Sequence, residues 1–190
     1  MNGLDQLRQR FNTLSTQTDE EWRRFCAIVE PVTYAKNDFL IRAGQVEKYV
    51  HYLVNGMVRL FLYHEGKDIS LDFSFSHDFV SAYSSFLTEQ PTDFTVQCLT
   101  DVQALRFNRA NLSALYDHSH QAERMGRLIA EQAFLRKTTR EVLFLTSTAK
   151  QRYVQLLEQN PVLVQTISVR HLASYLGIEP ESLSRIRREI

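Results

Sequence analysis

The residue types best suited to recognition chemistry lie at the C-terminal end of the sequence, in the segment ESLSRIRREI. Arginine can donate two hydrogen bonds to guanine, a carboxylate can accept one from the amino group of cytosine, and serine can bind base or phosphate. Arg185 follows Glu181 by four residues, so both side chains would project along one side of a helix. The side chains predicted to contact DNA from this segment are Glu181, Ser182, Ser184, Arg185 and Arg188.

A helix-turn-helix would hold these side chains in place. Ser168 suits the start of a first helix, Gly177 gives the backbone freedom for a tight turn, and Pro180 suits the first position of a second helix. In this motif the second helix enters the major groove, whereas the first lies over the DNA backbone. Arg170, near the start of the first helix, is therefore predicted to contact phosphate.

The charge of the chain is uneven, although its formal total is zero. Residues 1–118 carry 11 basic and 15 acidic residues, and residues 119–190 carry 11 and 7. A basic C-terminal part is expected if only that part meets polyanionic phosphate. Ordinary variation in surface charge is the alternative explanation of this asymmetry. For the helix pair, the alternative is that the two helices only close the domain, with Glu181 and Arg185 as a solvated ion pair.

A long helix is predicted over residues 118–145. Residues along it alternate steps of three and four, which is the spacing of a coiled-coil seam. The same helix of a second copy would bury this stripe and give a two-fold dimer, whereas packing on the chain's own β domain is the alternative. The predicted dimer interface consists of Met125, Leu128, Gln132, Leu135, Thr139 and Val142.

Short alternating segments rich in β-branched and aromatic residues run from Pro31 to about Arg109, separated by turn signals. No helix-length segment lies between them, which favours an antiparallel roll over a parallel sheet. We expect a helical lead-in over residues 4–29 and a short helix over 82–87. The predicted fold class is α+β: an N-terminal antiparallel β-roll (double-stranded β-helix, jelly-roll-like) with flanking helices, a long dimerisation helix and a C-terminal helix-turn-helix domain. No C-terminal wing is expected, because Ile190 follows the last helix directly.

Composition argues against several other classes of protein. No uncharged apolar stretch approaches the roughly 18 to 20 residues that span a bilayer, and no secretory signal opens the sequence, so we expect a cytoplasmic protein with no membrane partner. Cys26 and Cys98 form no CxxC motif. A cupin-type metalloenzyme would need clustered ligands on strands, but the one His-x-His pair, His118 and His120, lies at the entrance to the long helix. We expect no enzymatic activity, no catalytic residues and no metal site.

With these parts in place, the chain resembles the Crp/Fnr superfamily of bacterial transcription regulators over nearly all of its length. The most specific match is LASYLGIEPESLSRIRREI, which places Glu181 and Arg185 on the family's base-contacting positions. TAKQRYVQLLEQNP resembles the segment between the dimer helix and the DNA-binding domain, and Gly44 and Gly56 match the roll's usual glycine turns. The resemblance implies a homodimer that binds double-stranded DNA, with RNA polymerase as a further partner. The implied domains are a cyclic-nucleotide-binding-like sensor at 1–117, a dimerisation helix at 118–145 and a helix-turn-helix domain at 146–190.

The family's phosphate-binding cassette, G-x-x-x-G-E followed by an arginine, is altered here. His77 and Ser81 replace the glycines and Ala82 replaces the glutamate. The position of the arginine falls at or near Thr92, so the arginine is missing. A buried cyclic phosphate would lack its counter-charge, so we expect weak or no binding of cyclic AMP in the usual mode, and no cofactor. The segment either forms a remodelled pocket for an unidentified small-molecule effector or is filled by its own side chains. The candidate pocket residues are His77, Ser81, Ala82, Tyr83, Ser84, Ser85, Thr92 and Asp93.

A second function stays open at this point. Glu179 stands where serine or threonine would cap the last helix better, and Pro180 offers no side-chain contact to DNA. Together with the missing wing, these features allow a ligand-sensing or protein-interaction β-roll protein that no longer binds DNA.

Overall fold

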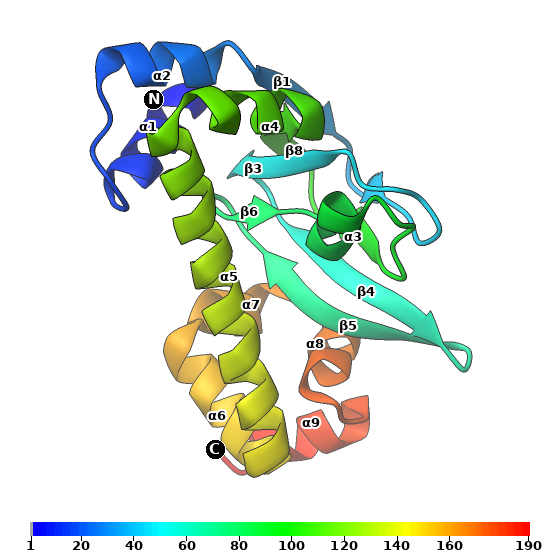
Figure 1. Cartoon of the computed structure of the whole chain (residues 1–190). Coiled ribbons are helices and arrows are strands. Elements are labelled where there is room, and N and C mark those ends of the chain that lie inside the picture. Colours follow the sequence, from blue (N-terminus) through cyan, green and yellow to red (C-terminus); the bar gives the residue numbers. More distant parts are fainter. Residues whose placement is uncertain (1) are drawn as a thin grey trace.

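Two four-stranded antiparallel sheets pack face to face in the computed structural model, which describes residues 2–190 (Figure 1). One sheet has the order β1-β8-β3-β6 and the other the order β2-β7-β4-β5. Leu53, Val58 and Val96 are among the apolar side chains that fill the space between them. The strands are β1 (Val29–Tyr34), β2 (Phe39–Ile41), β3 (Tyr49–Asn55), β4 (Val58–His64), β5 (Lys67–Ser74), β6 (Phe79–Val80), β7 (Thr95–Cys98) and β8 (Val102–Asn108). The predicted α+β class with an antiparallel β-roll is confirmed; Met1, where the predicted sensor domain starts, lies outside the described residues.

Alternation along the strands decides which side chains enter the roll. In β3, Leu53 faces the space between the sheets, whereas Tyr52 packs on the opposite side against helices. The turns fall where the sequence signals them, and Asn37 and Glu65 adopt the left-handed conformation with φ of 74° and 50°. Strand β6 was not predicted, because two residues are too few for an alternating pattern.

Helices cover the outer face of the first sheet. They are α1 (Gly3–Asn12), α2 (Asp19–Cys26) and α4 (Arg109–His118), with α3 (Tyr83–Thr88) inserted after β6. Asn2 and Thr18 begin α1 and α2 as capping boxes, in which side chain and backbone satisfy each other. Phe11, Phe25 and Phe107 lie in the buried cluster that joins these helices to the sheet.

Helix α5 (His120–Thr146) is the longest element and runs from the N-terminal helices to the C-terminal ones (Figure 1). The hydroxyl of Ser119 accepts a hydrogen bond from the backbone N–H of Ala122 and fixes its start. The helix predicted to begin at 118 therefore starts two residues later.

The remaining helices are α6 (Ala149–Gln159), α7 (Pro161–Thr166), α8 (Val169–Leu176) and α9 (Pro180–Arg188). Pro161 follows α6 and begins α7, where its missing N–H costs nothing because the first turn of a helix lacks acceptors. Leu172, Leu176 and Leu183 are buried against Tyr153 and other residues of α6 and α7. This cluster fixes the angle between α8 and α9.

Candidate nucleic-acid interface and ligand pocket

The C-terminal helix pair is built as the sequence indicates. The Ser168 hydroxyl accepts from the backbone N–H of His171 and begins α8. Gly177 ends α8 with a φ of 69°, a left-handed conformation that favours glycine and lets the chain reverse. Pro180 occupies the first position of α9, and Glu179 before it forms no side-chain cap. The pair therefore has helix-turn-helix geometry.

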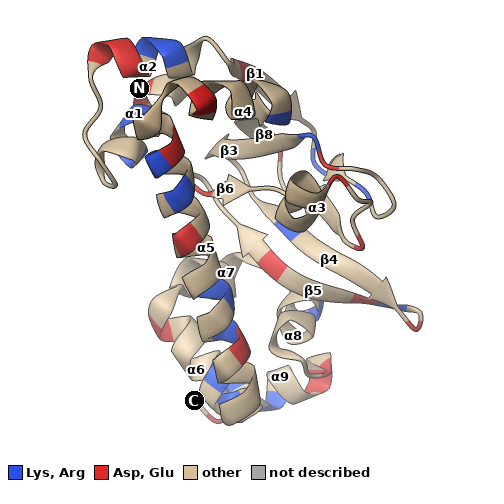
Figure 2. Cartoon of the chain, in the orientation of Figure 1, with Lys and Arg blue, Asp and Glu red and all other residues tan. Residues whose placement is uncertain are grey.

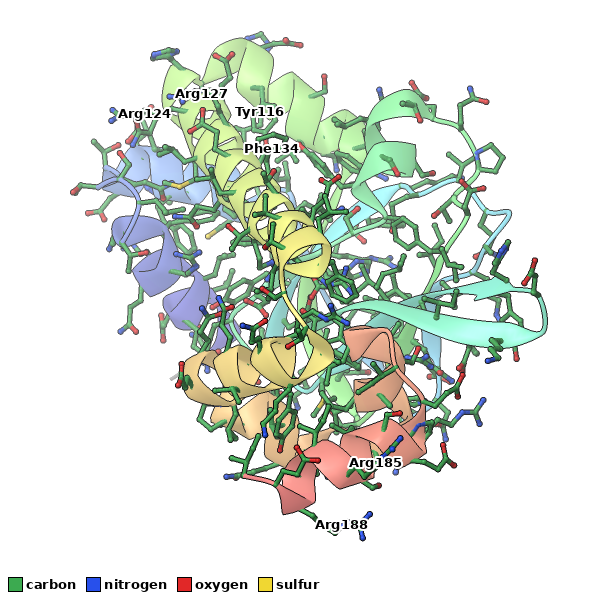
Figure 3. All side chains as sticks on the ribbon, turned by 90° about the horizontal axis from the view of Figure 1, so that it is seen from below. Tyr116, Arg124, Arg127, Phe134, Arg185 and Arg188 are labelled. Carbon is green, nitrogen blue, oxygen red and sulfur yellow. The ribbon has the colours of Figure 1, made fainter. Side chains whose placement is uncertain are left out.

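One face of α9 is left open to solvent. Glu181, Ser184, Arg185 and Arg188 recur at steps of three and four and are all exposed, and Ser182 is half-buried beside them. Arg185 lies 3.5 Å from the Ser182 hydroxyl and forms no ion pair with Glu181 among the described residues. Figure 3 shows Arg188 extending beyond the helix, and Figure 2 places these charges at the opposite end of the molecule from the acidic turn of α2. The geometry gives no support to a Glu181–Arg185 ion pair.

Arg187, the remaining arginine of α9, has a different role. The guanidinium of Arg187 donates to the carbonyl oxygen of Val164 at 3.2 Å and lies over the ring of Tyr153, 5.8 Å from its centre. It therefore holds α9 against α6 and α7. Arg187 is not among the side chains predicted to contact DNA, which fits this position.

Arg170, the predicted phosphate contact, lies where α8 meets the roll. Its guanidinium is 3.5 Å from a carboxylate oxygen of Asp68 on β5, and the other oxygen accepts from the buried Arg59 at 3.0 Å. Burial alone would raise the pKa of Asp68, but the hydrogen bond and charge of Arg59, with the charge of Arg170, hold it below its usual value. Asp68 therefore binds an arginine of α8 as an anion.

Further hydrogen bonds attach α8 to the edge strand β5. The backbone N–H of Ser70 donates to the Ser174 hydroxyl at 2.9 Å, and that hydroxyl donates to the carbonyl oxygen of Asp68 at 3.0 Å. The Ser70 hydroxyl donates to the carbonyl oxygen of His171 at 3.2 Å. Strand β5 thus has part of its free edge covered by the first helix of the pair. This junction was not predicted from the sequence, where Arg59 within an apolar strand is its one signal.

The start of α3, where the altered cassette lies, is occupied by Glu47. This carboxylate is 3% exposed and accepts the backbone N–H groups of Lys48 and Tyr49 at 3.0 Å and that of Ala82 at 3.2 Å. Burial raises the pKa of Glu47, although these three hydrogen bonds favour the charged form and act against the shift. An internal side chain therefore takes the backbone N–H of Ala82 at the start of α3, a donor that an anionic ligand there could use.

Other residues of the cassette segment also form hydrogen bonds within the chain. The hydroxyl of Ser85 accepts from the backbone N–H of Glu47 and donates to the carbonyl of Gln90. Thr92, in the position of the missing arginine, is buried and its hydroxyl bonds to the backbone of Phe94. Ala82, Ser85 and Thr92 therefore fill this region with their own contacts.

The predicted pocket residues do not line one cavity. The His77 ring pairs with the Tyr52 hydroxyl at 3.1 Å on an outer turn, and Ser84 and Asp93 are exposed. Only Ser81 and Tyr83 of the predicted set line the large cleft, of about 480 Å³, that lies between the roll and α5. The prediction is corrected in this respect, because alternation along the chain turns neighbouring side chains to different sides.

The predicted dimer stripe on α5 is partly covered within the chain itself. Met125 is 2% exposed in the cluster with α1 and α2, so its assignment to the interface is corrected. The side-chain oxygen of Gln132 accepts a hydrogen bond from Arg10 of α1 at 2.8 Å. Leu128 is half-buried and Thr139 is exposed. The exposed apolar residues of α5 are Leu135 (63%) and Val142 (53%) from the predicted set, together with Phe134 (68%) and Leu145 (81%), which we did not predict.

Comparisons with known proteins agree with this architecture. Residues 31–119 match the model of the cyclic nucleotide-binding domain. The sequence matches none of the curated proteins with which it was compared. Three solved structures are similar: CLP, described as a c-di-GMP responsive global regulator, from Xanthomonas campestris (18% identity, 90% of this chain and 91% of that one, TM-score 0.71), FixK2 from Bradyrhizobium japonicum (19%, 85% and 84%, 0.72) and the catabolite activator protein of Thermus thermophilus (19%, 93% and 84%, 0.57).

At 18–19% identity, these likenesses show the fold of the chain. Within residues 2–190, no helix is long and apolar enough to cross a membrane. The same residues contain no cluster of three or more His, Cys, Asp or Glu side chains arranged to hold a metal ion.

Proposed function

We propose that this chain, a Crp/Fnr-type regulator by its fold and its cyclic nucleotide-binding domain at residues 31–119, is a homodimeric transcription regulator that binds specific double-stranded DNA sequences. The observation that carries the proposal is the open face of α9, where four polar side chains at helical spacing lack partners that would hold them inside. We assign residues 1–117 to sensing, 118–145 to dimerisation and 146–190 to DNA binding. The protein would act in the cytoplasm, with RNA polymerase as a further partner.

Each predicted DNA-contacting side chain has a role in this proposal. Arg185 donates two hydrogen bonds to guanine and Glu181 accepts one from cytosine, while Ser182 and Ser184 contact base or phosphate. Arg188, one turn further along, and Arg170 on α8 bind phosphates. Two copies would enter successive major grooves about 34 Å apart on a near-palindromic site.

The dimer would form through the exposed part of α5. Leu135 and Val142 lie seven residues apart, two turns of helix, and with Leu128 and Thr139 they form a stripe that a second α5 would cover. Leu145 adds exposed apolar surface of the kind that marks an interaction site.

Docking of α8 on β5 would regulate DNA binding. Asp68 binds the guanidinium of Arg170, so a DNA phosphate and Asp68 compete for the same cation. A signal that weakens the contact between α8 and β5 would free this arginine and allow α9 to reorient.

The effector is not cyclic AMP in the usual mode. Glu47 already accepts the backbone N–H of Ala82, so a cyclic phosphate brought to that position would find this donor occupied. Thr92 supplies no counter-charge in place of the missing arginine.

Selection of bound fragments from a random DNA pool tests the proposal. The full chain should enrich a near-palindromic site whose half-sites are one helical turn apart, and a footprint on it should show paired protection. A β-roll protein that only senses a ligand would enrich no sequence, even at low salt, where non-specific binding is strongest.

A further inference from the structure

One cleft between α5 and the roll differs in its chemistry from the filled cassette. Its volume is about 480 Å³, within the range of small-molecule sites. Phenylalanines from α1, α2, β6, α3 and β8 form one wall. The opposite wall is α5, which contributes the small residues Gly126, Ala130 and Ala133 and ends the cleft with Arg136 and Lys137.

The shape of the cleft follows from the helix that lines it. Gly126 and Lys137 are eleven residues apart, which is close to three full turns, so both face the same side of α5. At about 1.5 Å per residue they lie about 16 Å apart along the axis. A molecule that touches both ends must therefore be long and narrow.

Two phenols lie at the Gly126 end. The hydroxyl of Tyr116 rests so close to α5 that a Cβ on Gly126 would lie 2.2 Å from it. Burial raises the pKa of Tyr116 and of Tyr83, and Tyr83 adds to the shift of Tyr116, so both remain protonated donors at neutral pH. Neither hydroxyl is hydrogen-bonded to any part of the chain between residues 2 and 190.

The opposite end carries one uncompensated positive charge. Arg136 is 3.3 Å from a carboxylate oxygen of Asp72, which balances it. Lys137 is exposed and has no carboxylate within ion-pair distance in the described part of the chain. The cleft thus has an apolar middle, hydrogen-bond donors at one end and a cation at the other.

The surface used for dimerisation does not close this cleft. Successive residues of a helix are about 100° apart, so Leu128, Leu135 and Val142 lie on the side of α5 opposite Gly126 and Lys137. Phe134 and Leu87, which are exposed, flank the cleft instead, and Figure 3 labels Phe134 with Tyr116. A dimer formed through the predicted stripe would leave the cleft available.

We propose that this cleft binds an elongated apolar carboxylate that carries a hydroxyl or carbonyl group at its far end. The carboxylate pairs with Lys137, the chain lies along Gly126, Ala130 and Ala133, and the distal polar group accepts from the phenols of Tyr83 and Tyr116. This inference rests on the proposed function, because it names the class of effector that the sensor would recognise.

Isothermal titration of the full chain with omega-hydroxydodecanoate, below the concentration at which it forms micelles, tests the ligand class. We expect saturable binding that is tighter than that of dodecanoate, which lacks the distal hydroxyl, and of dodecanol, which lacks the charge. Trp22, the only tryptophan, gives a local signal, because its ring lies 6.2 Å and 5.9 Å from those of Phe11 and Phe25 in the cleft wall.

Three variants locate the site. Lys137→Gln should weaken the acids about threefold or more and leave dodecanol unchanged, whereas Lys36→Gln, an exposed lysine on the far side of the roll, should change neither. Ala133→Trp should fill the cleft and weaken all three ligands about tenfold or more. Size-exclusion chromatography and thermal melting confirm that each variant is folded.

The absence of saturable binding by the folded wild-type protein would overturn the inference. So would a Lys137→Gln variant that binds the acids and dodecanol with the same affinities as the wild-type protein does. Binding of omega-hydroxydodecanoate by a protein that selects no DNA site would instead leave the ligand site standing and remove the proposed function. Selection of a DNA site by a protein that binds none of these ligands would remove the ligand site and leave the proposed function standing.

Discussion

The helix α9 and the segment around α3 use their polar side chains in opposite ways. On α9, Glu181, Arg185 and Arg188 face solvent, while apolar residues on the other side hold the helix in place. Around α3, Glu47 and Ser85 turn inward and satisfy backbone groups. Within the described residues, the exposed side chains of α9 form only hydrogen bonds within their own helix, at 3.0 to 3.5 Å, and stay accessible to an external partner, whereas the buried groups around α3 must first lose their own hydrogen bonds. This contrast is why we propose DNA recognition at α9 and an effector other than cyclic AMP bound in the usual mode.

Replacing Glu47 with alanine should produce the largest effect. It leaves the backbone N–H groups of Lys48, Tyr49 and Ala82 without their acceptor, which should lower the free energy of unfolding by about 3 kcal/mol or more. Urea denaturation measures the change, and Glu158→Ala, which removes an exposed carboxylate of α6, is the control. A loss below about 1 kcal/mol would show that the cassette is not held together by this carboxylate.

The second prediction concerns His51, which is buried in β3 and bonded through Nε2 to the Tyr34 hydroxyl. Burial, with the nearby charge of Arg106, lowers the pKa of His51 to about 4. The unfolded chain protonates His51 more readily than the folded protein does. The contribution of neutral His51 to the free energy of unfolding is therefore complete above about pH 6.5 and is lost as the pH falls toward 4. Unfolding free energies of wild type should therefore fall by about 2 kcal/mol more than those of His51→Gln over this interval. Parallel curves for the two proteins would contradict a neutral buried histidine.

The dimer surface gives the third prediction. A glutamate in place of Leu135 would bring two unpaired charges into the apolar seam, which should weaken the dimer by about 2 kcal/mol. Sedimentation velocity should show wild-type dimers and variant monomers at the same micromolar concentration. The exposed Tyr63 at the end of β4 supplies the control Tyr63→Glu, which should remain dimeric. A dimeric Leu135→Glu variant would place the interface elsewhere.

The smallest effect is expected at the junction between α8 and β5. Ser174→Ala removes an acceptor for Ser70 and a donor to Asp68, which should loosen α8 and raise DNA affinity about threefold, or less than 1 kcal/mol. Ser113→Ala, an exposed serine on α4, should change nothing. Weaker DNA binding by Ser174→Ala would mean that the docked arrangement favours DNA binding instead of opposing it.

Local patterns predicted most of the elements and the open face of α9, because helix caps, turn residues and periodicity act over a few neighbours. Ser168, Gly177 and Pro180 each define the helix pair within a single turn. The burial of Met125 and the position of Glu47 beside Ala82 depend on residues distant in sequence, which no local period encodes. The same limit applies to the junction of Asp68 with Arg170, where a strand and a helix about a hundred residues apart meet.

The measurement that tests the central claim most directly is binding of Arg185→Ala to the selected DNA site and to its single-base variants, by fluorescence anisotropy at fixed salt. We predict a loss of about 1 to 3 kcal/mol of discrimination at one base pair per half-site, with the other positions unchanged. Arg24→Ala, an exposed arginine of α2 at the other end of the molecule, should bind like wild type. An equal loss on every sequence would make Arg185 a phosphate contact, and no loss at all would contradict DNA recognition by α9.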